Sequence, residues 1–186
     1  MPRRTISFQK GHFYHIYHRG NNRTDIFFEE ENYAYFLFLL HRHLPPNNFR
    51  IHAYCLMVNH FHILAELITD CAVSRCMKNL LIAYTKGMNK RYRRVGHLFQ
   101  GQFGCKEVDS ELYALTLSRY IHANPVSAGF VKKGEDWKYS SYRSYLGIDF
   151  DPWVSTTLAD KYFKSVDEYR EFVATIPNDA NNFRSL

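Results

Sequence analysis

The pattern of hydrophobic and polar positions predicts a chain of alternating strands and helices. Aromatic and β-branched side chains alternate with other residues over 12–19, which favours a strand. Leu80, Leu81 and Tyr84 follow a helical period, which predicts a helix from Val73 to about Arg91. The other predicted elements are a helix at 29–44, strands at 49–58, 60–67 and 103–108, a helix from 109 or 110 to 124, and a helix at 166–176.

Capping and breaking residues set the ends of these predicted helices. Acidic residues from Glu29 suit a helix N-terminus, and Pro45-Pro46 stops the same helix. Asp109 or Ser110 can cap the next-to-last helix. We expect Pro125 to end that helix, because a proline disfavours the helical conformation of the residue before it. A polar, frayed tail is expected after the last helix.

The order of the first seven elements is strand, helix, strand, strand, helix, strand, helix. This order predicts an α+β fold with a ferredoxin-like or RRM-like antiparallel sheet and helices packed on one face. We expect residues 1–150 to form the functional domain and residues 151–186 to form a C-terminal helical extension of the same domain.

Composition narrows the function classes. The 186 residues are 46% hydrophobic and carry a formal net charge of +6, with a pI near 9.1. A core can therefore form, and a basic surface permits nucleic-acid binding without proving it. Four cysteines without a CxxC pair suggest neither a disulfide framework nor a zinc knuckle. No signal peptide or membrane-length apolar stretch is visible, so a cytoplasmic location without membrane association is expected.

The pair His60 and His62 is the main candidate for metal binding. On a strand, residues i and i+2 point to the same side, so both imidazoles would face one way while Phe61 enters the core. Imidazoles on one face can hold a divalent metal. A second pair, His41 and His43, is expected to be surface residues, because it falls at the end of a helix. Ten histidines make one such pair common by chance, so the pair alone is weak evidence.

Tyr120 and Asn124 are spaced i, i+4 on a predicted helix. The spacing places a phenol and a carboxamide oxygen on one helical face. Among the tyrosines predicted on helices, only Tyr120 has a possible metal ligand four residues later. The alternative is a core aromatic followed by a C-terminal cap before Pro125, and the spacing alone favours that alternative.

Basic residues cluster in two places, and either cluster could contact DNA. Arg19 and Arg23 flank the turn at Gly20, where phosphate or base contacts are possible. The end of the predicted helix from Val73 could follow a phosphate backbone, and its neighbours Tyr84 and Tyr92 could stack on bases. A solvated helix end explains this stretch equally well. The residues of the second cluster are Lys86, Lys90, Arg91, Arg93 and Arg94.

Several ordered motifs resemble the single-tyrosine HUH transposases, and most closely the REP-associated tyrosine transposases. The motifs span most of the chain, from about residue 13 to residue 147, in the family's order. They are YHIYHRGNNR at 14–23, AYCLMVNHFHIL at 53–64, LFQGQF at 98–103, RYIHANPVSAGFV at 119–131 and WKYSSY at 137–142.

The resemblance implies roles for the candidate residues. His60 and His62 would be metal ligands, Asn124 the third ligand, and Tyr120 the nucleophile. The metal would be Mg²⁺ or Mn²⁺, which suits phosphate oxygens and an amide. Insertion-sequence members commonly carry Gln at the third ligand, so the shorter Asn124 would need the metal closer to its helix. Val58 replaces a common Pro, a change expected to matter little.

The activity implied is transposase chemistry on single-stranded DNA that contains hairpins. The phenol, with an ordinary pKa near ~10, would need help to ionise and would form a 5′-phosphotyrosine. Two alternatives stay open: a non-catalytic module that binds single-stranded nucleic acid, and a nuclease in which the metal activates water. Relatives are dimers or monomers, and we expect a monomer here.

Overall fold

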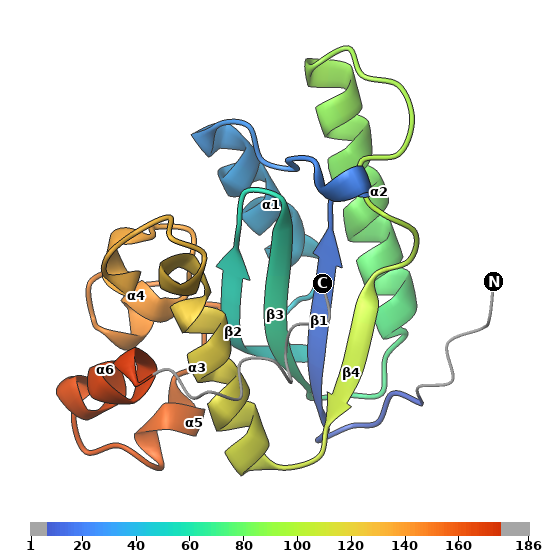
Figure 1. Ribbon diagram of the computed structural model, residues 1–186. Coiled ribbons are helices and arrows are strands. Elements are labelled where there is room, and N and C mark those ends of the chain that lie inside the picture. The colour runs from blue at the N-terminus through green and yellow to red at the C-terminus, as the bar shows by residue number, and fades with distance from the viewer. Residues whose placement is uncertain (1–6, 176–186) are drawn as a thin grey trace.

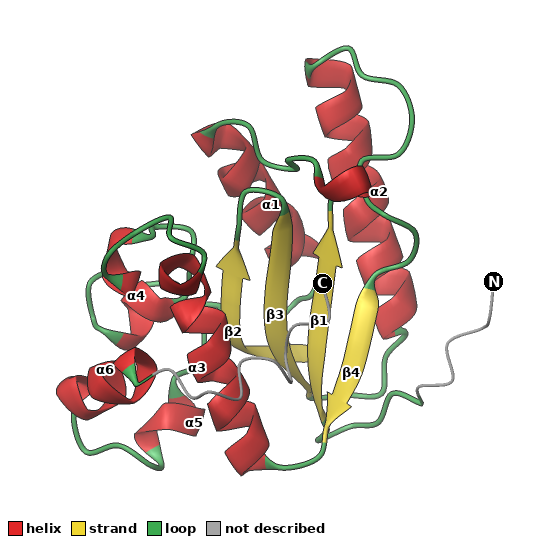
Figure 2. Ribbon diagram, viewed as in Figure 1, coloured by secondary structure: helices red, strands yellow, loops and turns green. Residues whose placement is uncertain are grey.

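The computed structural model describes residues 7–175 and contains the predicted βαββαβ core. Its elements are β1 (Phe13–Arg19), α1 (Glu30–His43), β2 (Phe49–Leu56), β3 (His60–Leu67), α2 (Val73–Arg91) and β4 (Gly104–Val108). The strands form one antiparallel sheet in the order β2-β3-β1-β4, which is the ferredoxin-like order. The predicted α+β class and the ferredoxin-like sheet are confirmed (Figures 1 and 2).

Helices cover both faces of the sheet, which corrects the expectation of helices on one face. One core cluster joins α1 and α2 to strand residues such as Ile16, Phe61 and Ile63. A second cluster joins α3 (Glu111–Ser127) to residues of the opposite face, such as Leu64 and Val108. The alternation of side chains along each strand makes this division possible, because both faces carry apolar residues. In Figure 1, α3 stands in front of the sheet, while α1 and α2 lie behind it.

Helix α3 begins where the sequence predicts and ends later than predicted. Its N-cap is Ser110, as expected, and the Ser110 side chain accepts a hydrogen bond from the Tyr113 amide at 3.2 Å. The prediction that Pro125 ends the helix is wrong, because α3 continues to Ser127. A proline removes only its own amide donor, and its carbonyl still accepts a bond from Phe130. The helix stops before Gly129, whose φ of 74° suits a left-handed end.

After α3 the chain forms short helices that pack against it. They are η2 (Gly134–Asp136), α4 (Tyr142–Tyr145), α5 (Thr157–Asp160) and α6 (Val166–Ala174), and a further 3-10 turn, η1 (Asn21–Arg23), follows β1. His122 on α3 holds this region in place: its Nδ1 lies 2.8 Å from the Tyr169 hydroxyl and its Nε2 lies 2.8 Å from Ser141 Oγ. The predicted helix at 166–176 corresponds to α6, which ends at Ala174, and Ile176 and the expected tail lie outside the described residues.

The segment at 137–142 covers the outer edge of β2. The Leu56 amide donates to the Tyr139 carbonyl at 2.9 Å, and the Tyr54 amide donates to Ser141 Oγ at 2.8 Å. An uncovered edge strand offers unpaired amides to other chains, so this segment satisfies groups that would otherwise be open. Within residues 7–175, no helix combines the length and apolar character that crossing a bilayer requires.

Candidate functional site

His60 and His62 begin strand β3 and face α3. Their rings are 5.1 Å apart between centroids, whereas Phe61 between them is fully buried in the cluster under α1 and α2. The strand starts at a tight connection from β2, in which the Met57 amide donates to the His60 carbonyl at 2.8 Å. The structure therefore brings both imidazoles to one face of the sheet, as the spacing predicts.

The His62 ring has one nitrogen that is held by the protein and one that is not. Its Nδ1 lies 2.9 Å from Nε2 of His15 on the neighbouring strand β1. Its Nε2 is buried and has no hydrogen-bond partner among the described residues. Buried polar atoms are nearly always paired, so this nitrogen is open to a water, an ion or a ligand. When the His62 Nδ1–H donates to His15, the Nε2 lone pair is left for a metal.

His60 is oriented in the same way by its neighbour. Its Nδ1 lies 2.7 Å from Asn59 Oδ1, an oxygen that can only accept, so Nδ1 carries the proton. The lone pair of His60 is therefore on Nε2. Asn59 thus fixes His60 in the tautomer that suits metal binding, and His62 has the same tautomer when its Nδ1–H donates to His15.

Burial keeps these imidazoles neutral. It lowers the pKa of His62 well below its usual range, and the nearby His15 and His60 act in the same direction. Burial also lowers the pKa of His60 to about 4, although contact with the Asn124 side chain opposes that shift. For His15, burial and the charge of Lys106 lower the pKa to about 3. Neutral imidazoles are the form that binds metals, so no proton must leave them at neutral pH.

Helix α3 brings Tyr120 and Asn124 to the histidines. The Tyr120 ring lies edge-on to the His62 ring, with centroids 5.5 Å apart and planes at 79°. Asn124, one turn later, is buried, and its side chain lies close enough to His60 to affect the pKa of that imidazole. These four predicted residues come together from two elements that are far apart in the sequence, which places a phenol beside a potential metal site.

The chemistry of the donor set fits a divalent cation with two imidazoles and one amide oxygen. Within residues 7–175, no group of three or more His, Cys, Asp or Glu side chains is arranged to hold a metal. A third protein ligand from this part of the chain would be of another type, and the Asn124 carboxamide is close to His60. Two imidazoles and one oxygen leave coordination positions for phosphate oxygens.

The predicted DNA contacts divide between the site and a distant helix end. Arg19 ends β1 directly opposite His60, and its Nε donates to Gln100 Oε1 at 2.7 Å. Arg23 is exposed in η1, and its carbonyl accepts from Asn59 Nδ2 at 3.2 Å. Arg19 therefore lies at the site, and Arg23 lies on a turn tied to it.

The basic stretch sits at the C-terminal end of α2 and the loop that follows. Lys86, Lys90 and Arg93 are exposed. Two other members have protein partners: Arg91 lies 2.6 Å from Glu29 Oε1, and the guanidinium of Arg94 lies 5.5 Å from the centre of the Phe28 ring.

Of the two neighbouring aromatics, one lies in the core and cannot stack on bases, which corrects the expectation for Tyr84. Tyr84 is fully buried, and its hydroxyl donates to the Ile26 carbonyl at 2.7 Å. The hydroxyl of the half-buried Tyr92 donates to the Glu29 carboxylate. A stripe of apolar residues along α2 explains Tyr84 better, since every third or fourth position of the helix faces the core.

Sequence reasoning missed His15 and Asn59 as parts of the site. The alternation of residues in β1 already placed His15 on one face of its strand. Which strand would pair with β1, and in which register, depends on the whole sheet, so the contact with His62 could not be read from spacing. Asn59 directly precedes His60, and its role depends on the geometry of the β2–β3 connection.

Comparison with known proteins gives a family and a fold. The family model described as "Transposase IS200 like" matches residues 8–124, more than half of the chain, and this range includes the four site residues. A solved structure of a REP-associated tyrosine transposase bound to a REP hairpin is similar, with a TM-score of 0.68 and 17% sequence identity. The similarity covers 83% of this chain and 98% of that one, and at this identity it shows the fold. No protein with curated annotation matches the chain.

Proposed function

Because the chain belongs to the IS200-like transposase family, we propose that it cuts and rejoins single-stranded DNA with Tyr120 as the nucleophile. The observation that carries the proposal is the placement of the Tyr120 phenol beside His62, whose buried Nε2 has no partner among the described residues. A non-catalytic module that only binds nucleic acid would not require this arrangement.

His60, His62 and Asn124 would hold a divalent cation, Mg²⁺ or Mn²⁺. Bound there, the cation would act as a Lewis acid toward the non-bridging oxygens of the scissile phosphate. His15 and Asn59 keep the two imidazoles in the required tautomer through their hydrogen bonds. The shorter Asn124 side chain is compatible with this role, since it is already in contact with His60.

Tyr120 performs the covalent step. Its phenolic oxygen attacks the phosphorus, its proton passes to solvent, and the 3′-oxygen of the upstream strand leaves and takes up a proton. The phosphorus stays joined to Tyr120 as a 5′-phosphotyrosine, so the energy of the ester bond is conserved. Attack by a second 3′-hydroxyl reverses these steps and reseals DNA without ATP.

The DNA substrate we propose is single-stranded and contains hairpins. The similar solved transposase is bound to a REP hairpin, and a flexible single strand can bend its phosphate into the site between β3 and α3. Arg19 lies beside His60 and would contact a phosphate near the scissile one. The exposed residues Lys86, Lys90 and Arg93 would contact the phosphate backbone farther away.

One chain supplies the whole proposed site. Tyr120 lies next to His62 and Asn124 next to His60 within the same molecule. A second copy is therefore not needed to complete the nucleophile and ligand set. This supports activity as a monomer, and sedimentation of the active species would test it.

A cleavage assay tests the proposed function. Single-stranded hairpin DNA, labelled at the 5′ or the 3′ end, is incubated with Mn²⁺ and the wild-type protein or Tyr120→Phe. Tyr113→Phe is the matched control, because Tyr113 lies on the same helix in an exposed position. The expected result is a covalent adduct on the 3′-labelled fragment that is absent with Tyr120→Phe and with chelator.

Two other outcomes would identify the rival functions. Free cleavage products from both the wild type and Tyr120→Phe would show a nuclease in which the metal activates water. Binding without cleavage over a panel of hairpins would show a non-catalytic module.

A further inference from the structure

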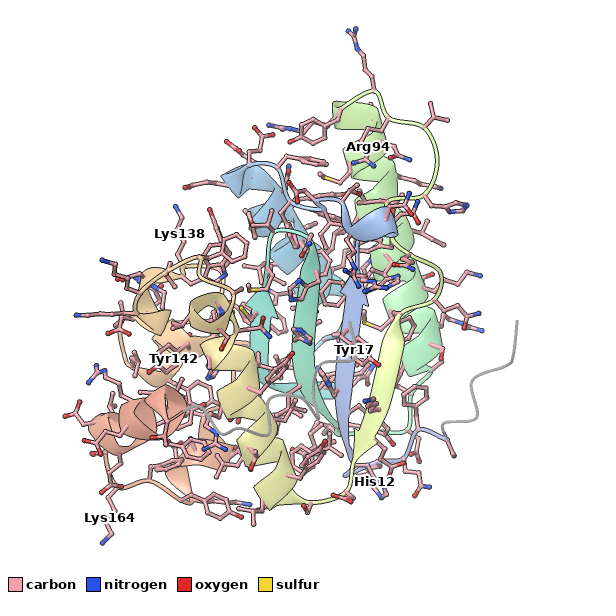
Figure 3. The ribbon with its side chains drawn as sticks, in the orientation of Figure 1. His12, Tyr17, Arg94, Lys138, Tyr142 and Lys164 are labelled. Carbon is pink, nitrogen blue, oxygen red and sulfur yellow. The ribbon has the colours of Figure 1, made fainter. Side chains whose placement is uncertain are left out.

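Tyr17 lies on the sheet beside the proposed metal site and has no part in the function described so far. It is on β1, directly opposite His62 on β3, and therefore on the same face as that imidazole. The Tyr17 ring is half-buried, with its centroid 6.2 Å from that of His62 and 4.8 Å from that of His15. A flat aromatic surface is thus next to the place where a scissile phosphate would bind. Figure 3 shows the labelled Tyr17 beside β1 and β4.

A glycine in β4 lets the Tyr17 ring lie across that strand. Gly104 is the partner of Tyr17 in the β1–β4 ladder. A Cβ atom at position 104 would lie 2.7 Å from Tyr17 Cδ2 and still closer to Cε2 and Cζ. Glycine inside a strand weakens it and commonly marks a place where another group approaches the backbone closely. Here that group is the Tyr17 ring, and any larger residue at 104 would push the ring away from the sheet.

Cationic side chains flank the ring along the strands. Arg19 follows Tyr17 by two residues on the same face of β1, and Lys106 follows Gly104 by two residues on the same face of β4. Two residues along a strand correspond to roughly 7 Å, so a cation lies on each side of the ring. Lys106 is exposed, and its charge helps to lower the pKa of His15. An aromatic ring between two cations matches the alternation of base and phosphate in single-stranded nucleic acid.

We propose that Tyr17 is a stacking platform for the nucleobase next to the scissile phosphate. The proposal rests on the proposed function and identifies how the substrate is held at the same site. Stacking on Tyr17 would fix one base over β1 and β4, so that the adjoining phosphate lies between His62 and Tyr120. Because every base has a flat face, this contact sets the position of the strand and tolerates different base sequences. Tyr17 is therefore a substrate-binding residue, distinct from the nucleophile.

Substitutions at two positions separate stacking from other roles of the residue. Tyr17→Phe keeps the ring and loses the hydroxyl, whereas Tyr17→Leu keeps an apolar side chain and loses the ring face. Gly104→Ala leaves Tyr17 intact but displaces its ring. Tyr162→Leu is the control, since Tyr162 is exposed after α5, outside the site. Circular dichroism and thermal unfolding would establish that each variant is folded.

The test uses the full chain carrying Tyr120→Phe, so that DNA is bound without being cut. The probe is a hairpin oligonucleotide with single-stranded tails and one 2-aminopurine, placed at each unpaired position in turn. Stacking quenches its fluorescence. We expect quenching at one tail position with Tyr17 intact and with Tyr17→Phe, and its loss with Tyr17→Leu or Gly104→Ala. The Tyr17→Leu protein should bind between about 5-fold and 150-fold more weakly.

Unchanged quenching and affinity in a folded Tyr17→Leu protein would overturn the platform. A different result would contradict the proposed function. In that case the protein with Tyr120 intact would form no adduct on the same oligonucleotide, although Tyr17-dependent quenching would persist. If Tyr17 is the stacking platform and Tyr120 cleaves the DNA, the quenched base should be one of the two that flank the cleaved phosphate. Quenching that depends on Tyr17 at a position away from that phosphate would also overturn the proposal.

Discussion

His15 Nε2 lies 2.9 Å from His62 Nδ1, so two neighbouring strands join their imidazoles behind the proposed metal site. The contact leaves His62 Nε2 buried, and Tyr120 lies beside the same ring, 5.5 Å away between ring centroids. A histidine that binds a metal through one ring nitrogen is usually oriented by a hydrogen bond at the other. His15 makes such a contact with His62. The site therefore depends on β1 as much as on the strand that carries the ligands.

Replacing His15 should weaken metal binding without removing a ligand. In His15→Phe, nothing at this position accepts the His62 Nδ1–H, so the ring is free to turn and to change tautomer. Loss of such an orienting partner typically lowers metal affinity about 10- to 100-fold. Titration with Mn²⁺, followed by electron paramagnetic resonance, measures this directly and needs no DNA.

The control for this prediction is His97→Ala, because His97 is an exposed histidine in the loop after α2. Its affinity for Mn²⁺ should equal that of the wild type. His15→Gln, which can still accept a hydrogen bond, should lose less affinity than His15→Phe. Equal affinity in all the variants would mean that His15 does not support the metal site.

The salt dependence of DNA binding should separate Arg93 from Arg91. Arg93 is exposed and is expected to contact phosphate, whereas Arg91 pairs with Glu29 in the protein. Arg93→Ala should reduce the slope of the logarithm of the DNA association constant against the logarithm of the salt concentration by about one, because one fewer phosphate is neutralised. Arg91→Ala should change this slope less. Fluorescence anisotropy of a labelled hairpin at several salt concentrations gives both slopes, and equal slopes would show that the two arginines do not differ in their contact with phosphate.

The stability of the fold should fall in mild acid because of His122. Burial lowers the pKa of His122 from 6.5 to about 3, so the unfolded chain binds a proton below pH 6.5 that the folded chain does not. The contribution of His122 to the free energy of unfolding is therefore complete above pH 6.5 and is lost as the pH falls from 6.5 toward 3. Between these pH values, His122 alone changes the free energy of unfolding by up to about 1.4 kcal/mol for each unit of pH.

Urea unfolding at several pH values measures how much of the pH dependence of stability is due to His122. His122→Gln should show a shallower dependence of the free energy of unfolding on pH between about 6 and 4 than the wild type. Tyr169→Phe removes the hydroxyl next to His122 Nδ1 and keeps the titrating ring, so it should be less stable but retain the wild-type slope. An unchanged slope in His122→Gln would show that other groups cause the acid sensitivity.

The fold was largely predictable because local patterns and the overall order of elements agree. The prediction for Val73–Arg91 matches α2, since its apolar stripe has a clear helical period. The end of α3 was mispredicted because the local effect of Pro125 is smaller than the stabilisation from packing α3 on the sheet. The position of α3 on the second face of the sheet was also missed, because spacing within a helix says nothing about which surface it will cover.

The candidate site was predictable where ligands are close in sequence and unpredictable where strands meet. His60 and His62 follow from strand alternation, and Tyr120 and Asn124 follow from helical spacing. That these pairs meet depended on the resemblance to a known family, since their spacing alone favoured core residues. The support from His15 depends on the register between β1 and β3, which only the folded sheet defines.

The tyrosine mechanism is tested most directly by identifying the residue that becomes joined to DNA. The adduct formed with Mn²⁺ and hairpin DNA is trimmed with nuclease, digested with trypsin and analysed by mass spectrometry. Cleavage after Arg119 and Lys132 gives a peptide that begins with Tyr120. We predict that this peptide carries the phosphonucleotide, with the fragment ions placing it on Tyr120. A phosphonucleotide on any other residue, or cut DNA with no modified peptide, would contradict it.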